Sequence, residues 1–175
     1  MNAALFVLLA AFQNGVNPDA ALVAQFQARV TDYVKLSDKI KSGLPPLKPT
    51  GSRDAVTERE TSLARLIQQA RPDATQGDFF APPIATEFRR LIRIALEGHG
   101  NVRVRKSLEH AEPVEGQIKV NAPYPPVPLQ STPPTLLANL PVLPAGLDYR
   151  IVGHTLVLRD VQANLVIDFI SKVFQ

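Results

Sequence analysis

The chain of 175 residues contains no cysteine. This absence excludes a disulfide framework, a thiolate metal site and a cysteine nucleophile. Tryptophan is also absent, and histidine occurs only three times. No apolar stretch reaches the ~20 residues that a membrane-spanning helix needs, which disfavours such a helix. The 45% apolar composition is nevertheless enough for one compact domain with a core of its own.

The sequence also lacks the motifs of familiar active sites. It has no G-x-x-x-x-G-K-[ST], no H-E-x-x-H, no G-x-S-x-G and no G-x-G-x-x-G. We therefore predict a protein that is not an enzyme and that carries no cofactor and no metal. Two alternatives stay open: a small-molecule or metal sensor that uses His99, His110 or His154 with nearby carboxylates, and a hydrolase with an unrecognised site.

The longest apolar run lies near the start, at residues 3–12. Ten apolar residues match the central region of a secretory signal, so residues 1–16 are interpreted as a signal-like segment. No Lys or Arg precedes Arg29, and no A-x-A box follows the run. We expect a periplasmic or secreted protein with a possible membrane association. The alternatives are a retained anchor and a buried amino-terminal helix.

Residues 17–100 carry three helical patterns. Asn17-Pro18-Asp19 favours a helix start, and apolar residues at three- and four-residue spacing continue until Gly43. A second pattern follows Asp54 and ends before Pro72, and together these two helices are able to form a hairpin. A third begins at Pro82-Pro83 and is expected to end near Gly98.

Residues 101–147 are predicted to form an extended, proline-rich strap. Residues 122–146 hold eight of the sixteen prolines, and such runs do not form regular ladders. Because this stretch also contains several leucines, we expect it to lie along the surface of the domain. The alternative is a ligand strip for a groove on another protein, in which Tyr124 is a candidate contact residue.

Residues 148–175 predict a small antiparallel meander. Two strand-like segments flank Gly153-His154, which suits a two-residue hairpin turn. Residues 165–170 are rich in strand formers and supply a third strand, with a terminal helix as the alternative. Asp160 is expected to cap a turn, and Asp168 is expected to face outward and protect an edge.

Positive charge is concentrated in one region. Six basic and two acidic residues fall between Thr86 and Lys106, giving +4, whereas the whole chain carries +3. The candidate partner-binding residues are Arg89, Arg90, Arg93, Arg103, Arg105 and Tyr124. The first three lie on the third helix, where they suit a phosphate, an anionic lipid headgroup or an acidic protein. No aromatic residues interleave with them, so nucleic acid is not expected. The alternative is a solvated helix face balanced by acidic residues.

The carboxy-terminal motifs carry a resemblance. LPAGLDYRIVG at residues 143–153, LVLRD at residues 156–160 and LVIDFI at residues 165–170 are similar to a pattern in exported bacterial proteins of uncharacterised activity. They also distantly resemble the β module of periplasmic nickel/cobalt homeostasis proteins. The resemblance implies an envelope location and a third strand at residues 165–170. It implies no activity, and the histidine-rich stretches of the metal-homeostasis proteins are missing here.

Together these features predict an α+β protein. A layer of about three helices is followed by the strap and by a meander that packs on the helices. The expected function is a non-catalytic interaction or accessory structural subunit of a larger envelope complex, with a protein partner.

Overall fold

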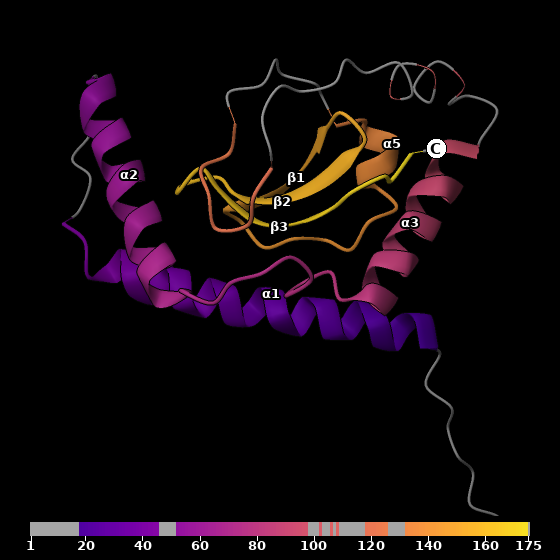
Figure 1. Cartoon of the computed structure of the whole chain (residues 1–175), viewed down its shortest axis with the longest axis horizontal. Helices are drawn as coiled ribbons and strands as arrows, with labels where there is room; N and C mark the ends of the chain where they lie inside the picture. The colour runs from indigo at the N-terminus through magenta and orange to yellow at the C-terminus, as the bar shows by residue number, and fades with distance from the viewer. Residues whose placement is uncertain are drawn as a thin grey trace, which may run out of the picture.

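The computed structural model of the chain describes residues 18–45, 52–97, 102, 106, 108, 118–125 and 132–174. Its helices are α1 (Pro18–Ser42), α2 (Arg53–Ala70), α3 (Pro82–Glu97) and the short α5 (Pro134–Leu137), and its strands are β1 (Leu147–Val152), β2 (Thr155–Asp160) and β3 (Leu165–Ile170). Helices come first and the sheet comes last (Figure 1). The α+β prediction is confirmed.

The three long helices begin and end close to the residues that the sequence indicated. α1 and α3 both start with proline, whose fixed φ and missing N–H are tolerated in a first helical turn. The Ser52 side chain caps α2 by accepting a hydrogen bond from the Ala55 N–H. Each apolar stripe faces the interior, and the buried positions include Phe26 of α1, Ile67 of α2 and Phe88 of α3.

α1 and α2 do not form the hairpin that the sequence allowed. Figure 1 shows α2 rising steeply from one end of α1, with α3 rising from the other end and the sheet between them. The buried residues of α2, Leu63, Ala64 and Ile67, lie in its second half, whereas Val56 in its first half is 45% exposed. Only the second half of α2 therefore contributes to the core.

The predicted meander is confirmed. The strand order is β1-β2-β3, and both pairs are antiparallel. Gly153 has a φ of +55° in the two-residue turn between β1 and β2, a conformation that glycine adopts without steric cost. Residues 165–170 form the strand and not the alternative terminal helix.

An aromatic cluster joins the helices to the sheet. The Phe26 ring lies 5.4 Å from the Phe80 ring, 4.8 Å from the Phe88 ring and 6.4 Å from the Tyr149 ring, measured between centroids. Phe26 comes from α1, Phe88 from α3 and Tyr149 from β1, so three elements meet at one point. Stacked and edge-to-face pairs at these distances add to the stabilisation from buried area.

Asp168 faces the core, which corrects the prediction that it points outward. Leu158 and Arg159, neighbours in β2, pair with Asp168 and Val166 in β3, so Ile167 is an extra residue on the β3 side. Such a bulge shifts the alternation of side chains by one position. Asp168 therefore turns inward and is 0% exposed, whereas strict alternation predicted an outward position.

The Asp168 carboxylate binds the loop between α2 and α3. It accepts hydrogen bonds from the backbone N–H of Gly77 at 3.0 Å, Phe79 at 2.8 Å and Phe80 at 2.9 Å, and from its neighbour Phe169 at 2.8 Å. Gly77 has a φ of +97°, a region that side-chain-bearing residues rarely adopt. Burial raises the pKa of Asp168, and the backbone donors oppose this effect. Through these hydrogen bonds, the Asp168 carboxylate connects β3 to the loop that leads into α3.

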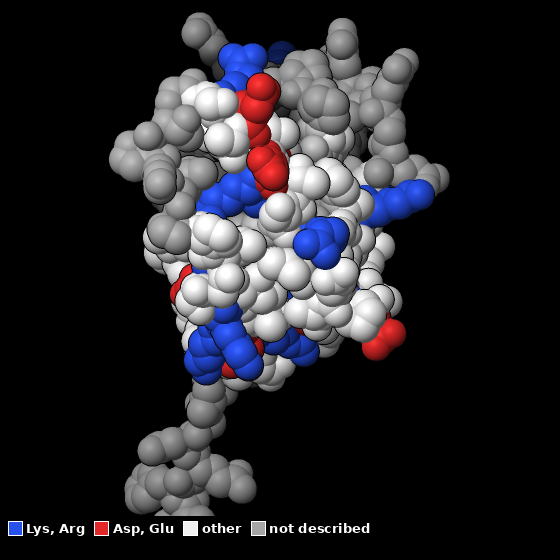
Figure 2. All heavy atoms as spheres, turned by 90° about the vertical axis from the view of Figure 1, so that its left-hand side faces the viewer, with Lys and Arg blue, Asp and Glu red and all other residues white. Residues whose placement is uncertain are grey.

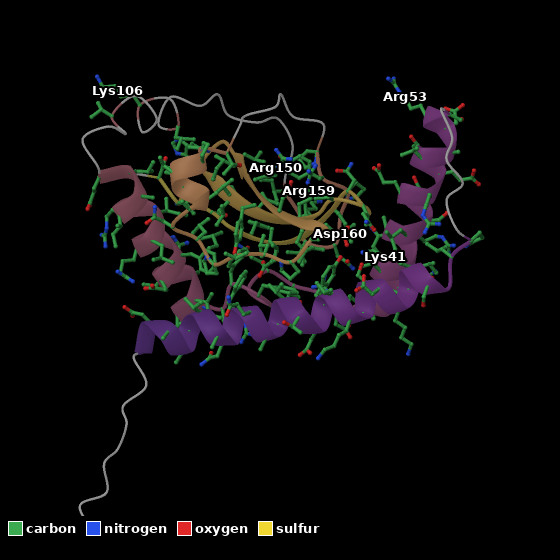
Figure 3. The ribbon with its side chains drawn as sticks, turned by 180° about the vertical axis from the view of Figure 1, so that it is seen from behind. Lys41, Arg53, Lys106, Arg150, Arg159 and Asp160 are labelled. Carbon is green, nitrogen blue, oxygen red and sulfur yellow. The ribbon has the colours of Figure 1, made fainter. Side chains whose placement is uncertain are left out.

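A second buried carboxylate, Asp160 at the end of β2, binds α1. It accepts hydrogen bonds from the Tyr33 hydroxyl at 2.9 Å and the Ser37 hydroxyl at 3.2 Å. Its other oxygen accepts from the N–H groups of Gln162 and Ala163, so the predicted turn cap is confirmed. Figure 3 shows Asp160 on the α1 side of the sheet, with Arg150 and Arg159 on the other side.

Residues 118–125 run along the free edge of β3. The Asn121 N–H donates to the Val166 carbonyl at 2.8 Å, the Val166 N–H to the Ala122 carbonyl at 2.9 Å and the Tyr124 N–H to the Asn164 carbonyl at 2.7 Å. The Asn121 side chain also donates to the Arg71 carbonyl at the end of α2. This part of the strap covers an edge that would otherwise expose unpaired backbone groups.

The later part of the strap contains α5, a short helix that the sequence did not indicate. Pro134 is its first residue, where proline fits without losing a hydrogen bond. Leu136 and Leu140 are 0% and 5% exposed, and α5 packs against α3. Two leucines of this stretch, Leu136 and Leu140, therefore complete the core, whereas Leu137 is 42% exposed.

We expect Asp168→Asn to destabilise the fold by about 2 kcal/mol, because an amide nitrogen would face backbone donors and leave at least one of them without an acceptor. The shift in the urea midpoint of unfolding, at constant m-value, measures this effect. The control is Asp73→Asn in the same loop, at an exposed position, which should change stability by less than about 0.5 kcal/mol. An equal loss of unfolding free energy in the two variants would contradict the conclusion that Asp168 stabilises the fold by binding this loop.

Candidate functional site

An open groove of about 390 Å³ lies where the start of α1 meets α3. Its walls combine apolar and charged residues from the two helices: Asp19, Leu22, Pro83, Thr86, Glu87, Arg89, Arg90 and Arg93. Three of the predicted partner-binding residues, Arg89, Arg90 and Arg93, therefore line this groove. We call these three residues the α3 arginine face. Three arginines and two carboxylates give the lining one net positive charge.

The helical period explains why these arginines share a face. Ile84, Phe88 and Ile92 are buried on one side of α3, which leaves the opposite side for polar residues. Arg89 and Arg93 are one turn apart and both exposed, so they stand next to each other along the helix. The buried side of α3 therefore sets the direction in which the arginines point.

Arg90 is held in place by two carboxylates. Its guanidinium binds the Glu87 carboxylate through two hydrogen bonds of 2.7 and 2.6 Å, and it lies 3.4 Å from the Asp19 carboxylate in the first turn of α1. The hydrogen bond to Glu87 raises the pKa of Arg90 above its usual value. Glu87 is 5% exposed. Arg90 thus connects α3 to the start of α1.

Arg89 and Arg93 are held more loosely. Arg89 donates to the backbone carbonyl of Ser171 at 3.0 Å, and within the described part of the chain it forms no ion pair with a carboxylate. Arg93 lies 3.9 Å from the Glu97 carboxylate, and both side chains are more than 60% exposed. Exposed pairs of this kind contribute little. These two guanidinium groups retain donors for an external anion.

Tyr124 belongs to a different surface. The guanidinium carbon of Arg159 lies over the Tyr124 ring, 4.8 Å from the ring centroid. The Tyr124 ring also packs beside Val152, Val157 and Val166 on the outer face of the sheet. Burial raises the pKa of Tyr124. Arg159 in turn donates to Asp148 at 2.9 Å. The structure uses the Tyr124 ring in packing, and its role in partner binding stays a prediction.

Other predicted candidates are only partly placed. Arg103, Arg105, His99 and His110 lie outside the described residues. His154 occupies the predicted hairpin turn, and its ring packs edge-on against Phe174 at 6.3 Å. Over the ranges that the structure describes, no three side chains of the metal-binding types gather into a cluster. The sensor alternative therefore gains no support from the placed residues.

The buried polar groups beneath the sheet bind one another. Asp160 receives four hydrogen bonds, and Ser37, which donates one of them, is only 2% exposed. Burial, followed by the charge of Asp160, raises the pKa of Tyr33 well above its usual range. A protonated, enclosed phenol and a fully satisfied carboxylate hold the fold together and lack access to a substrate.

Sequence reasoning found the arginines but not the groove. Arg90 and Glu87 are three residues apart, a spacing that signals an ion pair on a helix, whereas Asp19 lies 71 residues before Arg90 in the sequence. Leu22, Pro83 and Thr86 were assigned to helices, without a role at a surface. Only the packing of α1 against α3 brings these residues together.

No family model, curated protein or solved structure matches the chain. The resemblance of the carboxy-terminal motifs to exported bacterial proteins therefore stays a prediction. No helix in the described ranges has the length and apolar character to cross a membrane.

Replacing both looser arginines, in Arg89→Gln/Arg93→Gln, should lower the free energy of unfolding by no more than about 1 kcal/mol, because both residues are exposed. Thermal or urea unfolding measures the difference. A much larger loss would mean that these arginines serve the fold and would remove them as candidate partner contacts.

Proposed function

We propose that the chain is a non-catalytic protein of the bacterial envelope, exported to the periplasm or secreted, that acts as an interaction or accessory subunit of a larger membrane-associated assembly. Its partner contacts the α3 arginine face and the adjoining groove. The partner presents negative charge, because guanidinium groups bind carboxylates and phosphates through paired hydrogen bonds.

One observation carries this proposal: Arg89 and Arg93 line a groove that is partly apolar, and neither forms a close ion pair with a carboxylate among the described residues. Arg89 binds a neutral carbonyl, and the Arg93 pair with Glu97 is long and exposed. Leu22 and Pro83 add apolar area to the same groove. Charged donors next to apolar area are common features of a protein interface.

The arrangement of the buried polar groups supports a role without catalysis. Catalytic groups need access to a substrate and hydrogen-bonding capacity that the fold leaves available. The two buried aspartates instead direct their oxygens to α1, to the β2–β3 turn and to the loop before α3. Arg89 and Arg93, by contrast, lie exposed on the outside of α3, where they are accessible to a partner.

The experiment compares two charge reversals in the tagged, full-length protein in its native cells. We expect the unchanged protein to fractionate with the cell envelope in an assembly larger than a monomer, and Arg89→Glu/Arg93→Glu to reduce the bound fraction by about tenfold through repulsion. The control is Arg53→Glu/Arg65→Glu, which reverses two exposed charges on α2, at the opposite end of α1 (Figure 1).

The control region is suitable because its charges are mixed. In Figure 2, acidic and basic side chains are mixed over the upper part of the face that carries α2, while Lys and Arg side chains gather at its lower edge. Recovery of the unchanged protein only as a free, soluble monomer would overturn the proposed function. An equal loss of association in both double variants would remove its assignment to α3.

A further inference from the structure

The lining of the groove between α1 and α3 has two electrically different parts. One part is Arg90 with the carboxylates of Glu87 and Asp19, so that one positive charge faces two negative charges. The other part is Arg89 and Arg93, which carry two positive charges and are exposed. An anionic group is therefore expected to bind at Arg89 and Arg93, because at Arg90 it would meet two carboxylates.

The spacing of Arg89 and Arg93 suits two anionic groups. The two residues lie four positions apart on α3, which corresponds to a rise of about 6 Å along the helix. Arg89 donates to the neutral Ser171 carbonyl, and the 3.9 Å pair of Arg93 with Glu97 is exposed. A partner carboxylate would therefore replace weak contacts with charged hydrogen bonds at both arginines.

Apolar residues of both helices line the same groove. Leu22 of α1 is half-buried and Pro83 of α3 is exposed. The volume of about 390 Å³ lies near the lower end of the range for ligand pockets and is larger than one carboxylate or phosphate group. A flat membrane surface would leave these residues uncovered, whereas a chain segment that enters the groove buries them. The shape therefore favours a peptide segment as the occupant.

We propose that the groove between α1 and α3 binds a short acidic segment of a partner protein, whose carboxylates pair with Arg89 and Arg93 and whose apolar side chain packs on Leu22 and Pro83. This inference rests on the proposed function and names the class of partner that the site recognises.

The test selects peptides on the purified full chain from a displayed library of short random segments. We expect the enriched peptides to carry paired acidic residues beside an apolar one, and their binding to weaken with salt, as screening requires. For an enriched peptide, Arg89→Gln/Arg93→Gln should raise the dissociation constant about tenfold. The control, Arg53→Gln/Arg65→Gln on α2, at the opposite end of α1 (Figure 1), should change it less than about twofold.

Two further variants test where the peptide lies. Thr86→Trp places a large side chain in the groove at an exposed position, and it should weaken peptide binding about tenfold by displacing the apolar side chain of the peptide. The same change would strengthen binding to a membrane surface, because tryptophan favours the headgroup region. Glu97→Gln removes the carboxylate that competes for Arg93 and should strengthen peptide binding about twofold.

Three outcomes would overturn the inference. The first is enrichment of peptides without acidic residues. The second is a peptide affinity that neither the double arginine change nor Thr86→Trp lowers. The third is binding to phosphatidylglycerol vesicles that depends on Arg89 and Arg93 while no peptide is enriched, which would assign this surface to a lipid.

A final comparison distinguishes this inference from the proposed function. If no acidic peptide binds while envelope association persists and still depends on Arg89 and Arg93, the inference falls and the proposed function stands. If acidic peptides bind through these arginines while the protein in its native cells is only a free monomer, the proposed envelope role falls and the groove keeps its specificity. If neither binding nor association occurs, both fall.

Discussion

Two buried aspartates on the inner face of the sheet hold this fold together. Asp160 accepts hydroxyl donors from α1, and Asp168 accepts backbone donors from the loop that leads into α3. A buried carboxylate lowers the stability of the fold unless its oxygens accept hydrogen bonds. Both aspartates therefore require the sheet to pack against the helices in one particular position. The aromatic cluster around Phe26 fills the space between the sheet and the helices.

That constraint also decides where recognition can occur. Asp168 binds the loop as far as Phe80, two residues before α3 begins at Pro82, so the carboxylate positions the start of the helix that carries the arginines. Arg90 then connects α3 to the first turn of α1. The polar groups beneath the sheet are bonded to one another, whereas Arg89 and Arg93 remain exposed on the outer side of α3, where a partner can reach them.

Much of the fold was predictable because its signals are local. The apolar spacing between Asp19 and Gly43, the prolines at residues 82–83 and Gly153-His154 each act within a few residues, and each structure formed where it was expected. Asp168 was misplaced because the extra residue at Ile167 depends on the pairing of β3 with β2. The groove was missed because Asp19 and Arg90 are distant in sequence.

The sequence alone therefore determined the three long helices, the order of the strands and the side of α3 that carries arginine, since propensity and periodicity operate over one or two turns or strands, whereas the short helix α5 was not indicated. The tertiary structure alone decided the inward direction of Asp168, the steep rise of α2 from α1 and the meeting of Asp19 with Arg90. These depend on contacts between segments far apart in the chain, and their geometry follows from packing and from the need to satisfy buried charge.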